Sequence, residues 1–177
     1  MKMQVHQNKG FTLIELLIVV AIIGIIAAIA VPGLMRARMS GNEASAIGSL
    51  RAINSGQAAY STSCAQGAYA VTLEDLVKPP TGGNQGFVSP DLKSNGVTKS
   101  GYTVTIAQDG ASGTVAMSTV TTCNASAGTP ASSYFAKADP VTSGGTGTRF
   151  FGSDTRGTIF YDAATIANPI TVTTTVQ

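Results

Sequence analysis

Residues 11–31 read FTLIELLIVVAIIGIIAAIAV, the longest apolar stretch of the chain. In an α-helix each residue rises about 1.5 Å, so these 21 residues span roughly 30 Å, the thickness of the hydrocarbon core of a bilayer. Polar residues that include Lys2 and Lys9 precede the stretch, and Pro32 and Gly33 follow it. The sequence therefore predicts a membrane-spanning helix close to its amino terminus.

Glu15 is the only charged residue within this apolar stretch. An ionised carboxylate near the middle of a bilayer costs on the order of 3 kcal/mol, and a plain anchor would have no use for one. We expect Glu15 either to be protonated in lipid or to pair with a cation, such as a new amino terminus at Phe11 on a neighbouring copy. The alternative is a tolerated acid that lies close enough to the membrane surface to reach water.

An ordinary secretory signal is a second interpretation of the same stretch. Ala28-Ile29-Ala30 fits the small-x-small pattern of a signal peptidase site. However, the apolar run is longer than the roughly 7–15 residues of such signals, and Glu15 interrupts it. Basic residues lie on both sides of the run, so charge does not fix its orientation. Cysteine usage favours placing residues 34–177 outside the cytoplasm.

This region closely resembles the class III signal sequence of type IV pilins and type II secretion pseudopilins. The resemblance rests on a basic leader, on Gly10 and Phe11, on the acid at Glu15 and on Pro32 at the end of the apolar run. It implies that a prepilin peptidase removes the leader, residues 1–10, by cutting between Gly10 and Phe11. It also implies N-methylation of Phe11, and pairing of Glu15 with the terminal amine of an adjacent subunit during filament assembly.

Loss of the leader would change the chemistry of the chain. The full sequence has a formal net charge of +2, with 11 basic and 9 acidic residues. Without Lys2 and Lys9 the two kinds of charge balance, and no basic patch remains that would indicate nucleic-acid binding. The single histidine, His6, also lies in the leader. The mature chain would therefore have no imidazole for catalysis or for binding a metal.

No catalytic constellation is visible in the rest of the sequence. The chain has no GxSxG motif, and its paired glycines are not followed by the Lys-Ser/Thr of a phosphate-binding loop. The aspartates are scattered, without the spacing of a calcium-binding loop. We therefore expect no enzymatic activity, no cofactor and no metal site.

The helix is expected to continue beyond Pro32, because proline inside a long helix removes one hydrogen bond and causes a kink. After a first half over residues 11–32, the second half would cover residues 33–62. One face of it would carry small residues three or four apart, and the opposite face larger ones. The small residues are Gly33, Ala37, Gly41, Ser45, Gly48, Ala52, Gly56 and Ala59, and the larger ones are Ile47, Leu50, Ile53 and Tyr60.

Such a two-sided helix can pack its larger face on a sheet and bring its small face close to other helices. The alternative is that the glycines and alanines only reflect a biased composition. Arg36 and Glu43, seven residues apart, are expected to form a solvated pair on this helix or to contact other subunits.

Residues 63–177 form the expected head, which is rich in glycine, serine and threonine. Its patterns predict one short helical turn, a loop, two hairpins, a further strand and a tail that is either a strand or loose. In chain order these are the turn Thr72–Val77, the loop 80–100, the hairpin of Tyr102–Ile106 with Thr114–Ser118 around Asp109-Gly110, the strand Ser133–Lys137, the hairpin of Arg149–Phe151 with Thr158–Tyr161, and the tail Ile170–Val176.

The two cysteines, Cys64 and Cys123, have no CxxC partner that would indicate zinc or redox chemistry. In an exported protein they predict a single disulfide, which would join the end of the long helix to the sheet. Closing a loop of roughly 60 residues stabilises a fold by about 4 kcal/mol through chain entropy. Two free buried thiols are the alternative.

Together these features predict an α+β fold, in which a long amino-terminal helix packs on an antiparallel sheet, as in the pilin fold. The resemblance implies a structural subunit of a type IV pilus-like filament for adhesion, motility or DNA uptake. Its partners would be other copies of itself, the membrane, a prepilin peptidase and the inner-membrane assembly machinery. It would start in the inner membrane and end in an extracellular or periplasm-spanning filament. The alternatives are a pseudopilin that drives protein export and a membrane-anchored binding domain that never polymerises.

Overall fold

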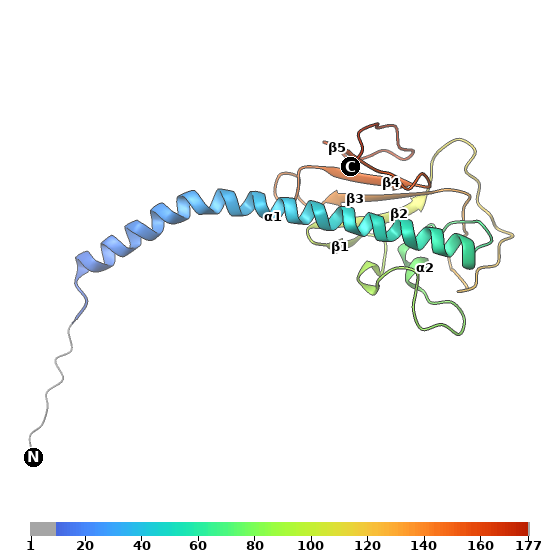
Figure 1. The fold of residues 1–177 in the computed structure, drawn as a ribbon, viewed down its shortest axis with the longest axis horizontal. Coiled ribbons are helices and arrows are strands. Elements are labelled where there is room, and N and C mark those ends of the chain that lie inside the picture. Colours follow the sequence, from blue (N-terminus) through green and yellow to red (C-terminus); the bar gives the residue numbers. More distant parts are fainter. Residues whose placement is uncertain (1–9, 177) are drawn as a thin grey trace, which may run out of the picture. The chain divides into compact units, whose positions relative to one another are not determined.

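The computed structural model describes residues 10–176, so most of the expected leader, including Lys2, His6 and Lys9, lies outside the described residues. The chain divides into two compact units, one ending at Ala37 and the other beginning at Arg38. The helix α1 (Leu13–Ser63) contributes to both units, and a five-stranded antiparallel sheet follows it. The predicted α+β fold, a long helix followed by an antiparallel sheet, is confirmed (Figure 1).

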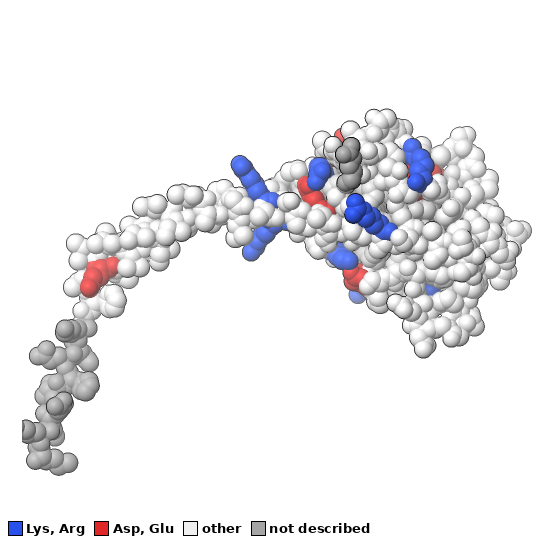
Figure 2. All heavy atoms as spheres, viewed as in Figure 1, with Lys and Arg blue, Asp and Glu red and all other residues white. Residues whose placement is uncertain are grey.

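The part of α1 before Arg38 presents apolar side chains to its surroundings. Every large apolar side chain from Phe11 to Met35 is exposed. Among residues 10–176, α1 is the only helix long and apolar enough to cross a membrane. Figure 2 shows one acidic group near the start of this part, and by sequence Glu15 is the only charged residue between Leu13 and Met35. Pro32 lies inside α1, so the helix continues through it as expected.

The part of α1 in the second unit packs against the sheet through its larger residues. Leu50, Ile53 and Tyr60 are fully buried, in one core with strand residues such as Val104 and Phe151. The opposite face is open, and a Cβ added at Gly41 or Gly48 would meet nothing within 4 Å. The expected division of the helix into a larger and a smaller face therefore holds along most of its length.

Two residues of this helix depart from that division. Gly56, expected on the open face, is buried, and an added Cβ would lie 2.6 Å from Val88 Cγ1 and 2.8 Å from the carbonyl oxygen of Phe87. Glu43, expected beside Arg36 as a solvated pair, is buried and pairs with Arg149 instead. Both expectations were wrong because segments distant in sequence cover these positions.

The sheet follows the order of the chain, from β1 to β5, and each strand runs antiparallel to its neighbours. The central pairing joins β2 to β3 in the register Tyr102↔Pro140 to Gln108↔Tyr134. The predicted strand near Ser133–Lys137 and the final hairpin are present, as β3 and as β4 with β5. The bounds are β1 Val97–Lys99, β2 Tyr102–Gln108, β3 Tyr134–Pro140, β4 Phe150–Asp154 and β5 Ile159–Asp162.

The predicted hairpin around Asp109-Gly110 is wrong. The partners of β2 are β1 and β3, and Thr114–Ser118 forms no strand. In that segment Ala116 makes only an isolated bridge with Ala131. The backbone N–H of Asp109 bonds to the carbonyl of Ser133, so β2 leads directly into its pairing with β3 and excludes the intervening segment.

The true first hairpin begins inside the predicted loop 80–100. β1 and β2 are joined by Ser100 and Gly101, whose φ angles of 47° and 71° are both positive. Two such residues make the tight turn that matches the twist of a hairpin. The short 3₁₀ helix η1 (Pro90–Leu92) also lies in this region, whereas the predicted turn near Thr72–Val77 is present as α2 (Leu73–Val77).

The tail after β5 covers part of the other face of the sheet. Ile166 is buried with Phe135 and Phe160, and Ile170 and Val172 pack against them, which makes a second small core. The end of the tail makes an isolated bridge to β5 rather than a sixth strand. The head is therefore a layered structure of helix, sheet and tail.

Candidate processing and assembly site

The peptide bond between Gly10 and Phe11 lies before the start of α1. Both residues and Thr12 are outside the helix and exposed, and the Phe11 side chain is 86% exposed. A protease must draw its substrate into an extended form, and backbone already bonded within a helix resists this. Since Gly10 also lacks a side chain, a peptidase can approach this bond closely.

Glu15 and Thr12 close the first turn of α1 around each other. The Thr12 backbone N–H and hydroxyl both donate to Glu15 Oε2, at 2.9 and 2.7 Å. In return, the Glu15 N–H donates to Thr12 Oγ1 at 3.3 Å. This reciprocal arrangement is a capping box, in which side chains satisfy N–H groups that have no partner inside the helix.

The capping box gives Glu15 a defined position at the start of an exposed apolar helix. Its charge lies at the positive end of the helix dipole, where an acid is favoured. Within the described part of the chain, Oε2 takes both bonds from Thr12 and Oε1 accepts none. An amine that approaches Glu15 from outside therefore finds an oxygen that is already oriented.

Thr12 was not among the residues singled out from the sequence. The signal that would have found it is the pattern Thr12-x-x-Glu15 directly before an apolar run, which is a helix-start signature. The cap leaves one carboxylate oxygen of Glu15 open, so it is compatible with the assembly role that the resemblance implies for this residue.

The remaining predicted residues lie apart from this site. Pro32 is in the same helix, and the expected kink there stays a prediction. Cys64 and Cys123 are joined by a disulfide in the head unit, with their Cα atoms 4.7 Å apart. Cys64 follows the end of α1, and Cys123 lies in the loop between β2 and β3 rather than in a strand. The bond thus links the helix end to a loop, not to the sheet as expected.

The surroundings of the disulfide hold that loop in place. The Cys123 N–H donates to the Cys64 carbonyl at 3.0 Å, and Thr81 donates to the Cys123 carbonyl through its N–H and its hydroxyl, both at 2.9 Å. Among residues 10–176 no group of three or more side chains is placed to hold a metal ion.

Comparison with known proteins places the amino-terminal site in a wider group. Residues 5–31 match the family model described as the prokaryotic N-terminal methylation motif. The chain is 46% identical over 54 residues to the type IV major pilin protein PilA of Myxococcus xanthus, which covers 30% of this chain and 24% of that protein. It is 42% identical over 86 residues to the type II secretion system core protein G of Pseudomonas aeruginosa, which covers 47% of this chain and 59% of that protein.

A third relative is aligned over a larger share of its length. The fimbrial protein EcpC of Eikenella corrodens is 36% identical over 114 residues, which cover 58% of this chain and 74% of that protein. The alignments with the first two relatives include less than two thirds of either, 24% and 59%. No solved structure matches the chain significantly.

Proposed function

Because this chain belongs to the type IV pilin and pseudopilin family, we propose that it is a structural filament subunit that polymerises through α1. One observation carries this proposal. From Leu13 on, the region that matches the methylation motif is an exposed apolar helix whose single acid, Glu15, is positioned by Thr12 with an oxygen left open. An anchor alone would gain nothing from such a carboxylate.

Processing would begin at the exposed bond between Gly10 and Phe11. A prepilin peptidase at the inner membrane would cut there, after which Phe11 would be N-methylated. The cut would create a cationic amine four residues before Glu15 and would remove the leader with Lys2 and Lys9. The subunit would then hold one cation and one anion at the same end of its apolar helix.

Assembly would pair Glu15 of one subunit with the Phe11 amine of the next. Inside a filament core of packed helices the dielectric is low, so an unpaired carboxylate is costly and a paired one is favoured. Pairing of the two charges would therefore fix the axial position of one helix relative to the next. A helix displaced along its neighbour would leave both charges unpaired. The open face of α1, with Gly41, Gly48 and Ala52 exposed, would allow other helices to approach closely.

A surface pilus is the form of filament that we favour. Figure 2 shows few charged side chains on the visible face of the head. The sequence of the head is rich in serine and threonine, and this combination suits a long-lived exposed surface. Two of the relatives are named as a type IV pilin and a fimbrial protein. Such a pilus would serve adhesion, motility or DNA uptake, and this role would be structural rather than catalytic.

A pseudopilus that drives protein export is the second candidate. It is favoured by the 42% identity to a secretion-system core protein over 86 residues, a length well beyond that of the apolar part of the helix. Electron microscopy of material sheared from cells distinguishes the two. Long surface filaments that contain this chain support the pilus, and their absence despite abundant processed subunit supports the pseudopilus.

The experiment that tests polymerisation replaces Glu15 by leucine and measures assembled filaments in cells that also make the processing and assembly machinery. We expect Glu15→Leu to enter the membrane and be cut, yet to yield at least about tenfold fewer filaments. The matched control, Ile18→Leu, changes an exposed apolar side chain of the same helix and should assemble normally. Equal filament yields for Glu15→Leu and the wild type would refute the assembly role. A methylated wild-type protein that never polymerises would instead indicate a membrane-anchored binding domain.

A further inference from the structure

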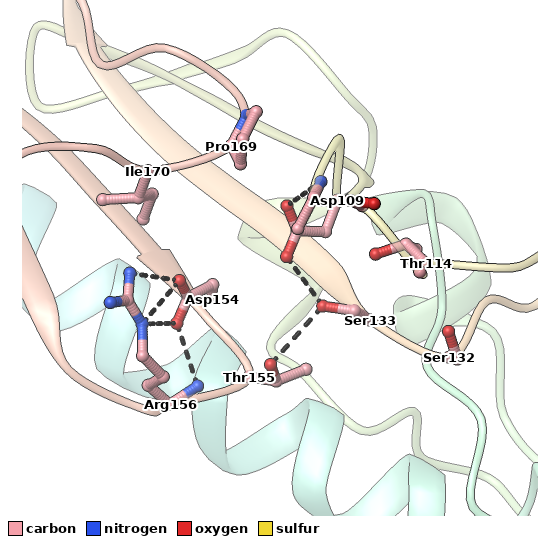
Figure 3. A pocket seen from close by; sticks show the side chains of 12 residues that line it. Asp109, Thr114, Ser132, Ser133, Asp154, Thr155, Arg156, Pro169 and Ile170 are labelled. Carbon is pink, nitrogen blue, oxygen red and sulfur yellow. Dashed lines mark hydrogen bonds and ion pairs between the residues drawn. The ribbon is translucent and has the colours of Figure 1, made fainter.

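The head contains a polar pocket that filament assembly through α1 does not explain. Its volume is about 470 Å³, which lies in the range of about 300–1,000 Å³ typical of small-molecule sites. Figure 3 shows labelled side chains from four segments around it. These are the loop after β2, the residues that precede β3, the end of β4 with the following turn, and the tail near Pro169.

Asp109 forms one side of the pocket and is 9% exposed. Its Oδ1 accepts the Ala111 N–H at 3.0 Å, and its Oδ2 accepts the Ser133 hydroxyl at 2.8 Å. These bonds fix the plane of the carboxylate and still leave each oxygen a second lone pair. Asp109 is therefore an oriented acceptor beside open space.

Asp154 and Arg156 form a second side of the pocket. The guanidinium of Arg156 bonds to both carboxylate oxygens of Asp154, at 2.6 to 3.0 Å, and its carbon lies 4.4 Å from the centre of the Phe160 ring. The side chain of Arg156 is nevertheless 53% exposed. Since these bonds use Nε and Nη2, the N–H groups of Nη1 remain available as donors in a fixed orientation.

Hydroxyl groups and a short apolar wall complete the lining. Ser132 Oγ accepts the Val115 N–H at 3.0 Å, so its own hydrogen is free to donate. Thr155 contributes a further hydroxyl, 3.4 Å from Ser133 Oγ, and Pro169 and Ile170 present apolar surface. The pocket is thus lined by hydrogen-bond acceptors and donors in fixed orientations, by hydroxyl groups that can rotate, and by a small apolar surface that can contact the C–H groups of a ligand.

We infer that this pocket binds an uncharged saccharide of one or two rings. Each sugar hydroxyl both donates and accepts hydrogen bonds, so it is matched by carboxylates and guanidinium groups held side by side. The three charged groups Asp109, Asp154 and Arg156 sum to −1, which disfavours anionic ligands such as nucleotides and uronic acids. Pairing of Arg156 with Asp154 also leaves too few free carboxylates for a cation site.

Saturation-transfer NMR on the unassembled full-length protein tests this inference. The protein is kept in micelles of a zwitterionic detergent without a sugar head group. The probes are lactose and N,N′-diacetylchitobiose as neutral disaccharides and glucuronate as an anion. We expect saturation transfer to at least one neutral probe and none to glucuronate. No transfer to either neutral probe, or equal transfer to glucuronate, overturns the inference.

Variants locate the site. Asp109→Asn should weaken binding of the neutral probe at least about tenfold, because a bond to a charged acceptor is lost. Thr155→Ala, which removes an exposed hydroxyl, should weaken it about threefold without risk to the fold. Asp162→Asn changes an aspartate on β5 that does not line the pocket, and should bind as the wild type does. Unchanged binding in Thr155→Ala and Asp109→Asn would show that the sugar binds elsewhere. Because the protein is unassembled, the result does not depend on filament formation.

Discussion

Glu43 on α1 and Arg149, directly before β4, form a two-point ion pair. Arg149 Nη2 and Nε lie 2.7 and 2.8 Å from Glu43 Oε2. The other oxygen, Oε1, accepts the backbone N–H and the hydroxyl of Thr148 at 2.9 and 3.1 Å. The guanidinium also lies 5.4 Å from the ring centres of Phe151 and Tyr161. This cluster ties the helix to the start of β4.

Removal of the cation from this cluster should destabilise the head. Arg149→Met keeps the length of the side chain but leaves the buried Glu43 carboxylate with only its bonds to Thr148 and the backbone. We expect the free energy of unfolding to fall by about 1–3 kcal/mol. Thermal or urea unfolding of the full-length protein in micelles, followed by circular dichroism, measures the loss.

The matched control for Arg149→Met is Lys99→Met, which breaks the partly exposed ion pair of Lys99 with Asp91 at the surface of the head. Exposed pairs contribute about 0–1 kcal/mol, so this variant should be clearly more stable than Arg149→Met. If both variants lost the same free energy of unfolding, the Glu43–Arg149 pair would contribute no more to stability than the pair at the surface.

The same cluster predicts how stability responds to acid. Burial raises the pKa of Glu43, but the hydrogen bonds from Thr148 and Arg149 and the charge of Arg149 outweigh it, so the pKa lies below its ordinary value. A lowered pKa adds stability above the pKa of the unfolded state, about 4.3 for glutamate, and this stability is lost as the pH falls through the folded value. Between pH 6 and pH 3 the free energy of unfolding should therefore fall more steeply with decreasing pH in the wild type than in Glu43→Gln. The same pH dependence in both proteins would contradict this expectation.

Gly56 and Gly48 should respond oppositely to the same substitution. In Gly56→Ala the new Cβ would meet Val88 and the backbone of Phe87, so we expect a loss of about 1–3 kcal/mol. Gly48→Ala places its Cβ in open space on the same helix and should stabilise the monomer by about 0.5–1 kcal/mol through helix propensity. Urea unfolding of both variants checks this, and a loss of similar size in Gly48→Ala would show that the helix positions are misassigned.

The long amino-terminal helix could be predicted from the sequence because its signals are local. The apolar run and the Gly10-Phe11 junction before it lie within one stretch, and so does the Thr12-x-x-Glu15 pattern, which the prediction did not use. The final hairpin of β4 with β5 was predictable for the same reason, because its strands are joined by a short turn.

The parts of the head that sequence does not predict depend on distant partners. Thr114–Ser118 alternates like a strand, but β2 pairs with β3, which lies beyond it. Val97–Lys99 is too short to detect by alternation, and only its Ser100-Gly101 turn reveals it. Glu43 was expected to be a surface residue because its partner Arg149 is distant in sequence. The proposed saccharide pocket is lined by four separate segments, which the sequence does not show to be neighbours.

Polymerisation through the amino-terminal helix depends on a cut after Gly10, which mass spectrometry of the mature amino terminus detects. We predict a protein that begins at Phe11 and carries one methyl group on its α-amine, with a mass increase of about 14 Da. A mature protein that begins at Val31 would indicate ordinary secretion, and an intact Met1 in the exported protein would indicate an uncut anchor. Either of these two results would contradict the account.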